Sequence, residues 1–216
     1  MRKTVMVTGA DRGLGFALCE ELLKTSGRQT GAESKTTFQV IAGRYMEEWK
    51  ELDALKQTYP DRLICVPLDV GDDNSVKTAV QKVMERVETV DMLIHCAGIN
   101  GTIRDIRDGY DYPGMLRTLN VNALGAIRVT EAFLPLMDRG ALNAGMAVLS
   151  NRLKKDGYEI RLYHPGWMNT YMMGTKEEHA DLNPEEAARL ALQSFFKIRE
   201  QEKLVLDSYD GSIIPW

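Results

Sequence analysis

The sequence predicts a doubly wound α/β fold with a parallel sheet of the Rossmann type, built as a single domain over residues 1–216. Short, almost continuously apolar segments alternate with segments whose apolar residues recur at helical spacing, as parallel strands and crossover helices do. A glycine-rich turn joins the first apolar segment to the first helical one. Ligands of such folds bind at the carboxyl ends of the strands, so the residues that follow each strand are the candidate site residues.

The first half of the chain repeats the strand–helix unit, and the spacing predicts its elements in order. Strands are expected at 4–10, 38–44, 62–70 and 90–99, and helices at 13–25, 46–59 and 75–87. The polar stretch 26–37 reads as an exposed loop. Asp72 to Ser75 offer capping side chains for the helix that follows them.

The second half begins with a loop and a long helix. We expect the loop at 101–114, helices at 115–137 and 141–157, a strand at 158–166 and a further loop at 167–182. Asn183 is predicted to cap a helix that starts with Pro184, and 203–208 is predicted to be the last strand.

Composition excludes several classes of function. The net charge of −4 argues against a nucleic-acid partner and against an anionic membrane surface, and no apolar run approaches the roughly 18 residues of a membrane span. Cys19, Cys65 and Cys96 are far apart and form no metal-ligand spacing, so neither a metal site nor a disulfide framework is expected. The first ten residues read as a strand rather than a signal peptide, and we expect a reducing, cytoplasmic setting.

The turn after the first strand has the composition of a pyrophosphate-binding loop. Glycine there allows a tight bend and lets backbone N–H groups approach the phosphates, and the following helix N-terminus favours an anion. The alternative is that the glycines serve only a tight turn. The candidate cofactor-binding residues of this turn are Thr8, Gly9, Asp11, Arg12, Gly13, Leu14 and Gly15.

The end of the second strand bears on which nicotinamide cofactor is preferred. A site for NAD(H) commonly places an acid there, but this strand ends Ala42-Gly43-Arg44. Arg12 lies in the glycine-rich turn itself, and two guanidinium groups suit a 2′-phosphate. The sequence therefore favours NADP(H), with NAD(H) possible. Alternatively, Arg44 is a solvated residue at a strand end.

Several motifs in order resemble the short-chain dehydrogenase/reductase family: "TGADRGLG" at 8–15, "LDV" at 68–70, "HCAG" at 95–98, "NVNALG" at 120–125 and "HPGWMNT" at 164–170. The endings "HPGW" and "DGSIIPW" are similar to the carbonyl-reductase-like branch that includes the bacterial C-factor proteins. The resemblance implies hydride exchange between a nicotinamide and a small carbonyl or alcohol substrate.

The resemblance also implies roles for single residues. Asp69 and Val70 would hold the adenine, Ala97 and Gly98 would line the cofactor, and Asn122 would position a proton-relay water. Pro165, Gly166 and Thr170 would contact the nicotinamide end. Singly, these residues also have structural interpretations: a strand-end cap for Asp69, a satisfied polar group for Asn122 and a plain turn for Pro165-Gly166. His95 and Cys96 stand where the family usually has asparagines, and we interpret His95 and His164 as structural residues of buried strands.

Family members use the long helix at 115–137 and its neighbour in subunit interfaces. Apolar residues lie on more than one face of this helix, and packing on the sheet explains one face only. We therefore expect a homodimer or a homotetramer.

The family's catalytic serine, tyrosine and lysine are not found. None of the eight tyrosines is followed by lysine four residues later. "LPLMDRG" at 134–140 resembles the residues before the family's fifth strand, and "ALN" at 141–143 resembles those after its catalytic lysine. We therefore expect that the fifth strand and the catalytic segment are missing between them.

Chain reach makes this junction difficult for the family's crossover. The helix at 141–157 would be about 24 Å long, and its start should lie at the opposite edge of the sheet from Met137. Three linking residues span only about 14 Å. Either a segment near 138–141 is missing from this sequence, which we favour, or the deletion is real. The first case predicts an oxidoreductase, and the second predicts a catalytically inactive NAD(P)-binding sensor or signalling protein.

Overall fold

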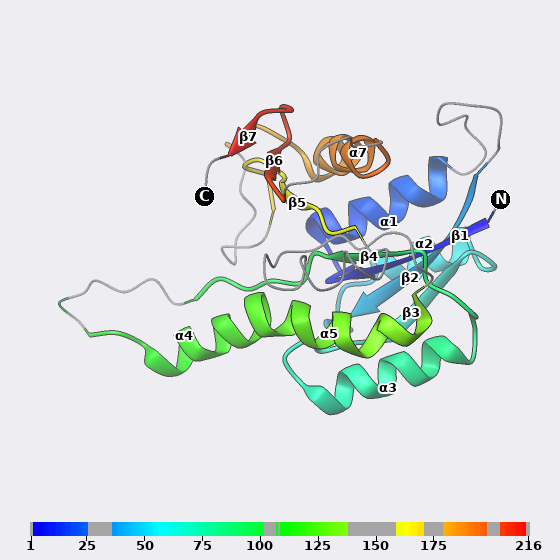
Figure 1. Cartoon of the computed structure of the whole chain (residues 1–216), viewed down its shortest axis with the longest axis horizontal. Coiled ribbons are helices and arrows are strands. Elements are labelled where there is room, and N and C mark those ends of the chain that lie inside the picture. The colour runs from blue at the N-terminus through cyan, green and yellow to red at the C-terminus, as the bar shows by residue number, and fades with distance from the viewer. Residues whose placement is uncertain are drawn as a thin grey trace.

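The larger sheet is formed by four parallel strands in the order β3-β2-β1-β4. The computed structural model describes residues 2–25, 36–101, 107, 109–137, 159–170, 179–197 and 204–214. The strands are β1 (Arg2–Thr8), β2 (Thr37–Arg44), β3 (Leu63–Pro67) and β4 (Met92–His95). Their carboxyl ends share one edge, as predicted for a doubly wound sheet (Figure 1).

Helices cover both faces of this sheet because alternate strand residues point to opposite sides. Val5 and Val7 of β1 pack into one apolar cluster and Met6 into the other, and all three are almost fully buried. The first cluster includes residues of α1 (Gly13–Thr25), α2 (Glu51–Thr58) and α7 (Pro184–Phe195). The second includes residues of α3 (Asp73–Met84) and α5 (Gly125–Phe133). The predicted fold class is confirmed.

A second, smaller sheet has the order β5-β6-β7. It consists of β5 (Leu162–His164), β6 (Leu206–Ser208) and β7 (Ile213–Ile214). β5 and β6 are parallel, whereas β7 returns antiparallel to β6, so the prediction that 203–208 is the last strand was wrong. The return is a tight turn in which Gly211 adopts a φ of 85°, and its N–H donates to the Ser208 carbonyl at 3.0 Å.

Within the described ranges, no strand pairs with both β4 and β5. The chain does reach the outer edge of β4: the Val90 N–H donates to the Leu136 carbonyl at 2.7 Å, and Met137 forms an isolated parallel bridge with Val90. This is where a fifth parallel strand would begin. The expected helix at 141–157 and the junction from Asp138 to Ala141 lie outside the described residues.

Two predicted helices differ in detail from the observed ones. The helix predicted at 46–59 begins only at Glu51, because Arg44 binds the carbonyls of Met46, Glu47 and Trp49 and holds the preceding residues as a loop. The helix predicted at 115–137 is a continuous helical run of four parts. They are α4 (Tyr112–Leu119), a π-helical turn (Asn120–Leu124), α5, and a 3₁₀ turn (Leu134–Leu136).

The two predicted helix caps have different outcomes. Asp72 caps α3 as expected, because its carboxylate accepts from the Ser75 N–H at 2.6 Å. Asn183 precedes Pro184 and an acidic first turn, so the helix start is confirmed, but its side chain makes no cap bond. It instead accepts from the Asn169 side-chain amide at 3.1 Å, which ties down the loop after β5. Among the described helices, none is both long and apolar enough to cross a bilayer.

Candidate cofactor-binding site

Thr8, the last residue of β1, fixes the start of the glycine-rich turn. It is fully buried, and its hydroxyl oxygen accepts from the N–H groups of Cys96 and Ala97, both at 3.1 Å. One side chain thereby joins the carboxyl ends of two adjacent parallel strands. The turn that follows is held against the end of β4, at the edge where this architecture binds ligands.

The glycines of the turn are required by space as well as by conformation. Gly9 and Gly13 have φ values of 63° and 59°, which disfavour any side chain. A Cβ on Gly9 would lie 2.7 Å from the Ala97 Cα, and one on Gly15 would lie 2.1 Å from the Gly9 carbonyl oxygen. The bare backbone of the turn and the N-terminus of α1 form a cradle that side chains would fill, and this fits a pyrophosphate. Leu14, in the first turn of α1, packs against the apolar cluster beneath.

Asp11 points away from the cradle and toward the end of β2. Its carboxylate is 5% exposed and accepts from the N–H groups of Tyr45, at 2.9 Å, and Met46, at 3.0 Å. The Ala10 N–H also donates to the Gly43 carbonyl at 3.0 Å. The glycine-rich turn is therefore hydrogen-bonded to the end of β2. An acidic side chain thus lies at this strand end, but its carboxylate is buried and bound to backbone N–H groups.

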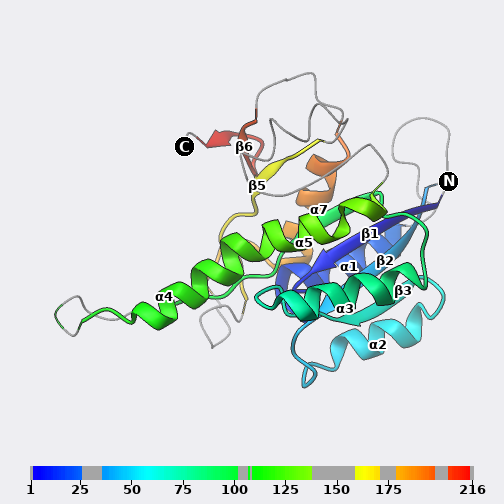
Figure 2. The ribbon, with the colours of Figure 1, turned by 60° about the horizontal axis from the view of Figure 1, so that its bottom comes forward.

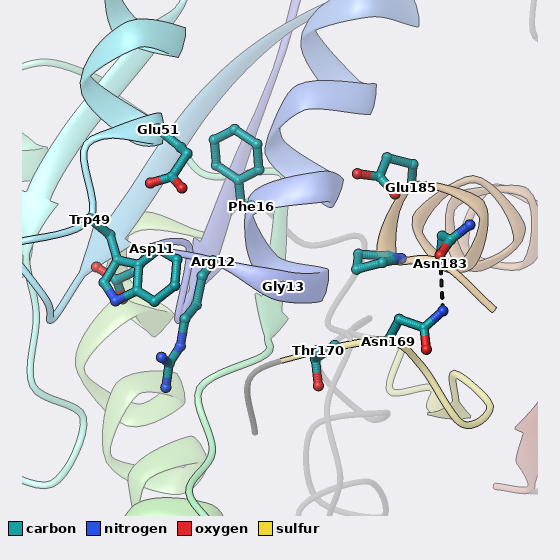
Figure 3. A pocket seen from close by; sticks show the side chains of 11 residues that line it. Asp11, Arg12, Gly13, Phe16, Trp49, Glu51, Asn169, Thr170, Asn183 and Glu185 are labelled. Atoms are coloured by element: carbon teal, nitrogen blue, oxygen red, sulfur yellow. Dashed lines mark hydrogen bonds between the residues drawn. The ribbon is translucent and has the colours of Figure 1, made fainter. Parts of the chain in front are cut away.

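Arg12 and Arg44 are in different electrostatic states. The Arg12 guanidinium lies 5.0 Å from the Trp49 ring centroid, and it has no acidic partner among the described residues (Figure 3). The Arg44 guanidinium donates to the Asp53 carboxylate at 2.7 Å, and this hydrogen bond raises the pKa of Arg44. Of the two cations predicted to face a 2′-phosphate, the structure leaves Arg12 available.

A pocket of about 200 Å³ opens beside the glycine-rich turn. The structure brings together here the N-termini of α1 and α7, the loop after β2 and the loop after β5 (Figure 3). Thr170 lies against α1, since a Cβ on Gly13 would be 3.6 Å from its methyl carbon. The pocket is lined by Asp11, Arg12, Gly13, Phe16, Trp49, Glu51, Asn169, Thr170, Asn183, Pro184 and Glu185.

Asp69 and Val70 lie at the end of β3 with their polar groups engaged. The Asp69 carboxylate accepts from the Gly71 N–H at 2.8 Å, so it caps its own turn. Val70 is 6% exposed and packs under Gly125, while its carbonyl accepts from Arg128 at 2.6 Å. The structural interpretation of Asp69, as a cap of its own strand end, fits this geometry, and an adenine-binding role for Asp69 and Val70 stays a prediction.

The end of β4 is held by a paired amide. The Asn122 side chain, in the π-helical turn, accepts from the Ile99 N–H and donates to the Ile99 carbonyl, both at 2.8 Å. It thereby fixes the backbone just after Ala97 and Gly98. Because both amide atoms of Asn122 are bound to Ile99, the groups that could hold a water are the backbone carbonyls of this turn and not the side chain.

Histidine and cysteine replace the two asparagines of the family here. The His95 Nε2 lies 3.0 Å from the Thr130 hydroxyl, and burial lowers the pKa of His95 to about 4. Burial also raises the pKa of the Cys96 thiol to about 12, which leaves it unreactive. Both side chains are structural.

The segment after β5 turns sharply at Gly166, which has a φ of 82°. A Cβ there would lie 2.9 Å from Leu182 and from Tyr209, so Pro165-Gly166 is a tightly packed turn that directs the chain toward Thr170. His164 accepts from the Gly166 N–H through Nδ1 at 3.2 Å and is exposed at the end of β5. None of the three residues of β5 is buried, so the expectation of a buried strand here was wrong.

Several pocket residues carry no signal in the sequence. Trp49 and Glu51 lie in a segment predicted to be plain helix, and Asn169 gains its role only because it contacts Asn183 across the fold. Among the described residues, no cluster of three acidic, histidine or cysteine side chains could hold a metal ion.

The geometry agrees with comparisons with known proteins. A model of the short chain dehydrogenase family matches residues 3–148. The C-signal protein of Myxococcus xanthus is 29% identical over 158 residues, which cover 59% of this chain and 93% of that protein. A 1-hydroxy-2-glutathionyl-2-methyl-3-butene dehydrogenase of Rhodococcus sp. (strain AD45) is 25% identical over 245 aligned positions, covering 99% of both chains.

The fold is also that of solved structures. The NADPH-bound carbonyl reductase from chicken fatty liver superposes with a TM-score of 0.82 and 23% identity, over the full length of both chains. At this identity the likeness shows the fold alone. The family match, which spans more than half of the chain, shows more: this protein belongs to the short-chain dehydrogenase/reductase family of oxidoreductases.

Proposed function

We propose that this protein is an NADP(H)-dependent oxidoreductase that interconverts a small-molecule carbonyl compound and its alcohol. The observation that carries the proposal is the cradle at the end of β1, where Gly9 and Gly15 leave no room for a Cβ. Arg12 follows in the same turn and has no acidic partner in the part of the chain that the structure describes. The carbonyl reductase with bound NADPH supports the same choice of cofactor.

Different residues of the chain would bind different parts of the dinucleotide. The N–H groups at the start of α1 would hold the pyrophosphate, and Arg12 would bind the 2′-phosphate through charge-assisted hydrogen bonds. Asp69 and Val70 would bound the adenine, and Ala97 and Gly98 the adjacent ribose. Pro165, Gly166 and Thr170 would lie at the nicotinamide end. When bound, the nicotinamide supplies or accepts the hydride.

The chemistry also needs a group that donates a proton to the substrate oxygen. A carbonyl oxygen that becomes an alcohol needs a positioned acid, and this sequence has no Tyr-x-x-x-Lys. The alignment with the Rhodococcus dehydrogenase runs over 245 positions although this chain has 216 residues, so about 30 residues of that protein have no counterpart here. That is enough for a strand, a loop and a catalytic segment. The proposal requires the acid to come from such a segment, joined between Met137 and Ala141.

The absence of the motif favours a second candidate. With the cofactor cradle intact and the acid missing, the 216-residue chain would bind NADP(H) without turnover, as a sensor or signalling protein. The C-signal relative is consistent with such a role by its name.

A titration separates these candidates. Intrinsic or cofactor fluorescence measures the affinity for NADPH and for NADH, and absorbance at the reduced nicotinamide band then follows turnover with aldehydes and ketones. NADPH binding with turnover supports the oxidoreductase, and binding without turnover supports the second candidate. If neither nucleotide binds, both are wrong.

Arg12→Ala sharpens the cofactor assignment. Loss of one charge-assisted contact should weaken NADPH binding by roughly 10- to 100-fold. Binding of NADH, which has no 2′-phosphate, should change little. An equal loss for both nucleotides would remove Arg12 from the phosphate site.

The exposed side of α4 supports assembly into a homodimer or homotetramer. α4 extends away from the sheet, and none of its residues is buried (Figures 1 and 2). Its large apolar side chains are exposed at helical spacing: Tyr112 66%, Met115 47%, Leu116 67% and Leu119 57%. Light scattering of the protein and of Leu116→Lys tests this, and a monomeric wild type at micromolar concentration would contradict it.

The free Cys19, Cys65 and Cys96 suit the reducing cytoplasm that we propose as its compartment.

A further inference from the structure

Arg44, the last residue of β2, is already engaged by the protein itself through all three of its guanidinium nitrogens. Its guanidinium donates to both Asp53 carboxylate oxygens, at 2.7 and 3.3 Å. Nε also binds the Met46 carbonyl at 3.3 Å, and Nη2 is shared with the carbonyls of Glu47 at 2.8 Å and Trp49 at 3.0 Å. Only 15% of the Arg44 side chain is exposed. A phosphate could form paired hydrogen bonds with Nη1 and Nη2 only by displacing the Asp53 carboxylate.

Asp53 is the acceptor that most resembles a phosphate. Carboxylates and phosphates both pair with the planar guanidinium fork through two parallel hydrogen bonds. Asp53 is the third residue of α2, where the helix N-terminus favours a negative charge. The hydrogen bond from Arg44 also lowers the pKa of Asp53. The internal partner is therefore charged throughout the neutral pH range.

The neighbouring backbone donors are taken as well. The N–H groups of Tyr45 and Met46, which directly follow β2, both donate to the buried Asp11 carboxylate. The two acids thus occupy the donors at the end of β2, and Arg12 alone has no acidic partner in the described part of this region.

We propose that Asp53 sets the cofactor preference of this protein by competing with the 2′-phosphate for Arg44. This inference rests on the proposed function, because it assumes that a nicotinamide dinucleotide binds at the glycine-rich turn. Asp53 is 42% exposed and lies on a helix surface, so it can move away from Arg44 at little cost. NADP(H) binds when the carboxylate is displaced, whereas NAD(H) binds with the ion pair closed.

The test is a comparison of dissociation constants for NADPH and NADH in the wild type and in Asp53→Asn. The Asp53 side of this ion pair is open to solvent, so the pair contributes only modestly, and its removal should tighten NADPH binding by about three- to fivefold. Binding of NADH should be unchanged. The selectivity ratio, rather than activity, is the readout.

Two further variants make the result specific to Arg44. Glu48→Gln removes the same charge from an exposed residue of the same loop that takes no part in the Arg44 contacts, and it should leave the ratio unchanged. Asp53 also lies 3.8 Å from Lys50, so Asp53→Asn frees a second cation. In an Arg44→Ala background, Asp53→Asn should lose its effect. A gain that persists there belongs to Lys50 and overturns the proposal.

The remaining outcomes are distinguishable. If the wild type binds NADPH but Asp53→Asn leaves the ratio unchanged, or if Glu48→Gln raises it equally, the competition does not exist and the proposed function stands. If the wild type binds neither nucleotide, the proposed function fails, and this inference fails with it.

Discussion

The two sheets of this protein differ in how far each strand depends on its neighbours. β1 lies between β2 and β4, and its last five residues are all buried. β5 pairs only with β6 in the described structure, and none of its three residues is buried. The nucleotide half therefore holds its site with its own strands. Among the described residues, no strand joins β4 to β5, the strand that precedes the residues proposed for the nicotinamide end.

This difference predicts that the proposed cofactor binding can be separated from the proposed turnover in this chain. The cradle requires only β1, α1 and the ends of β2 and β4, and all of these are in place. Four predictions would sharpen or break this contrast between the larger and the smaller sheet.

The largest effect is expected for Gly9→Ala. A left-handed φ costs a side chain about 1–2 kcal/mol, and here the added Cβ would also meet the Ala97 backbone at 2.7 Å. We expect several kcal/mol of lost stability, measured by urea unfolding, and loss of NADPH binding. Gly211→Ala is the control in the second sheet: its φ is 85°, but nothing lies within 4 Å of the added Cβ. Equal losses at the two positions would show that the cradle is not sterically closed.

Thr8→Val should have the next largest effect. The substitution keeps the shape but leaves the partly buried N–H groups of Cys96 and Ala97 without their acceptor. At roughly 1–3 kcal/mol for each of the two unsatisfied groups, the stability should fall by roughly 2–6 kcal/mol. Thr8→Ser keeps the hydroxyl and should recover most of it. A Thr8→Val protein as stable as the wild type would mean that β1 and β4 are not joined by this side chain.

His95 should make the first half sensitive to acid. Its pKa is lowered from 6.5 to about 4 by burial, so the unfolded chain takes up a proton that the folded chain excludes. The folded state therefore loses stability as the pH falls from about 6.5 to about 4. The expected loss from this group is up to about 3 kcal/mol. Urea midpoints at pH 7 and pH 4.5 measure it, and His95→Asn should show a smaller difference. The same pH dependence in both proteins would assign it to other groups.

The smallest effect concerns the helix caps. Asp72→Ala removes the bond to the Ser75 N–H and should destabilise the protein by about 1 kcal/mol. Asn183→Ala removes no cap bond from α7 and should cost about half of that or less. Thermal melts of both variants test this ranking. The reverse order would indicate that the exposed Asn169–Asn183 hydrogen bond contributes more to stability than the Asp72 cap does.

The elements that the sequence predicts best are those whose signals are local. α1 has the predicted bounds because helical spacing and the flanking glycine define it without any partner. The α3 cap is likewise read from four adjacent residues. The glycine-rich turn is predicted because its motif is contiguous.

The features that the sequence does not predict depend on contacts between distant residues. Nothing near Asp11 indicates that it would reach Tyr45 and Met46, 34 and 35 residues away. In the sequence Arg44 has the appearance of a free cation, because no local pattern indicates that it pairs with Asp53 of the next helix. Charge and position thus indicate a phosphate site, but only the folded contacts show which cation is engaged.

The π-helical turn between α4 and α5 has a consequence for how the long helix presents its two apolar sides. Each residue advances an α-helix by about 100°, so the one extra residue of such a turn rotates everything before it relative to everything after it. The turn Asn120–Leu124 therefore sets the angle about the helix axis between the exposed stripe of α4 and the buried stripe of α5. Shortening this turn by one residue would swing the α4 stripe around the helix axis and separate Asn122 from Ile99. A single insertion in the helix thus sets the direction in which the projecting arm faces.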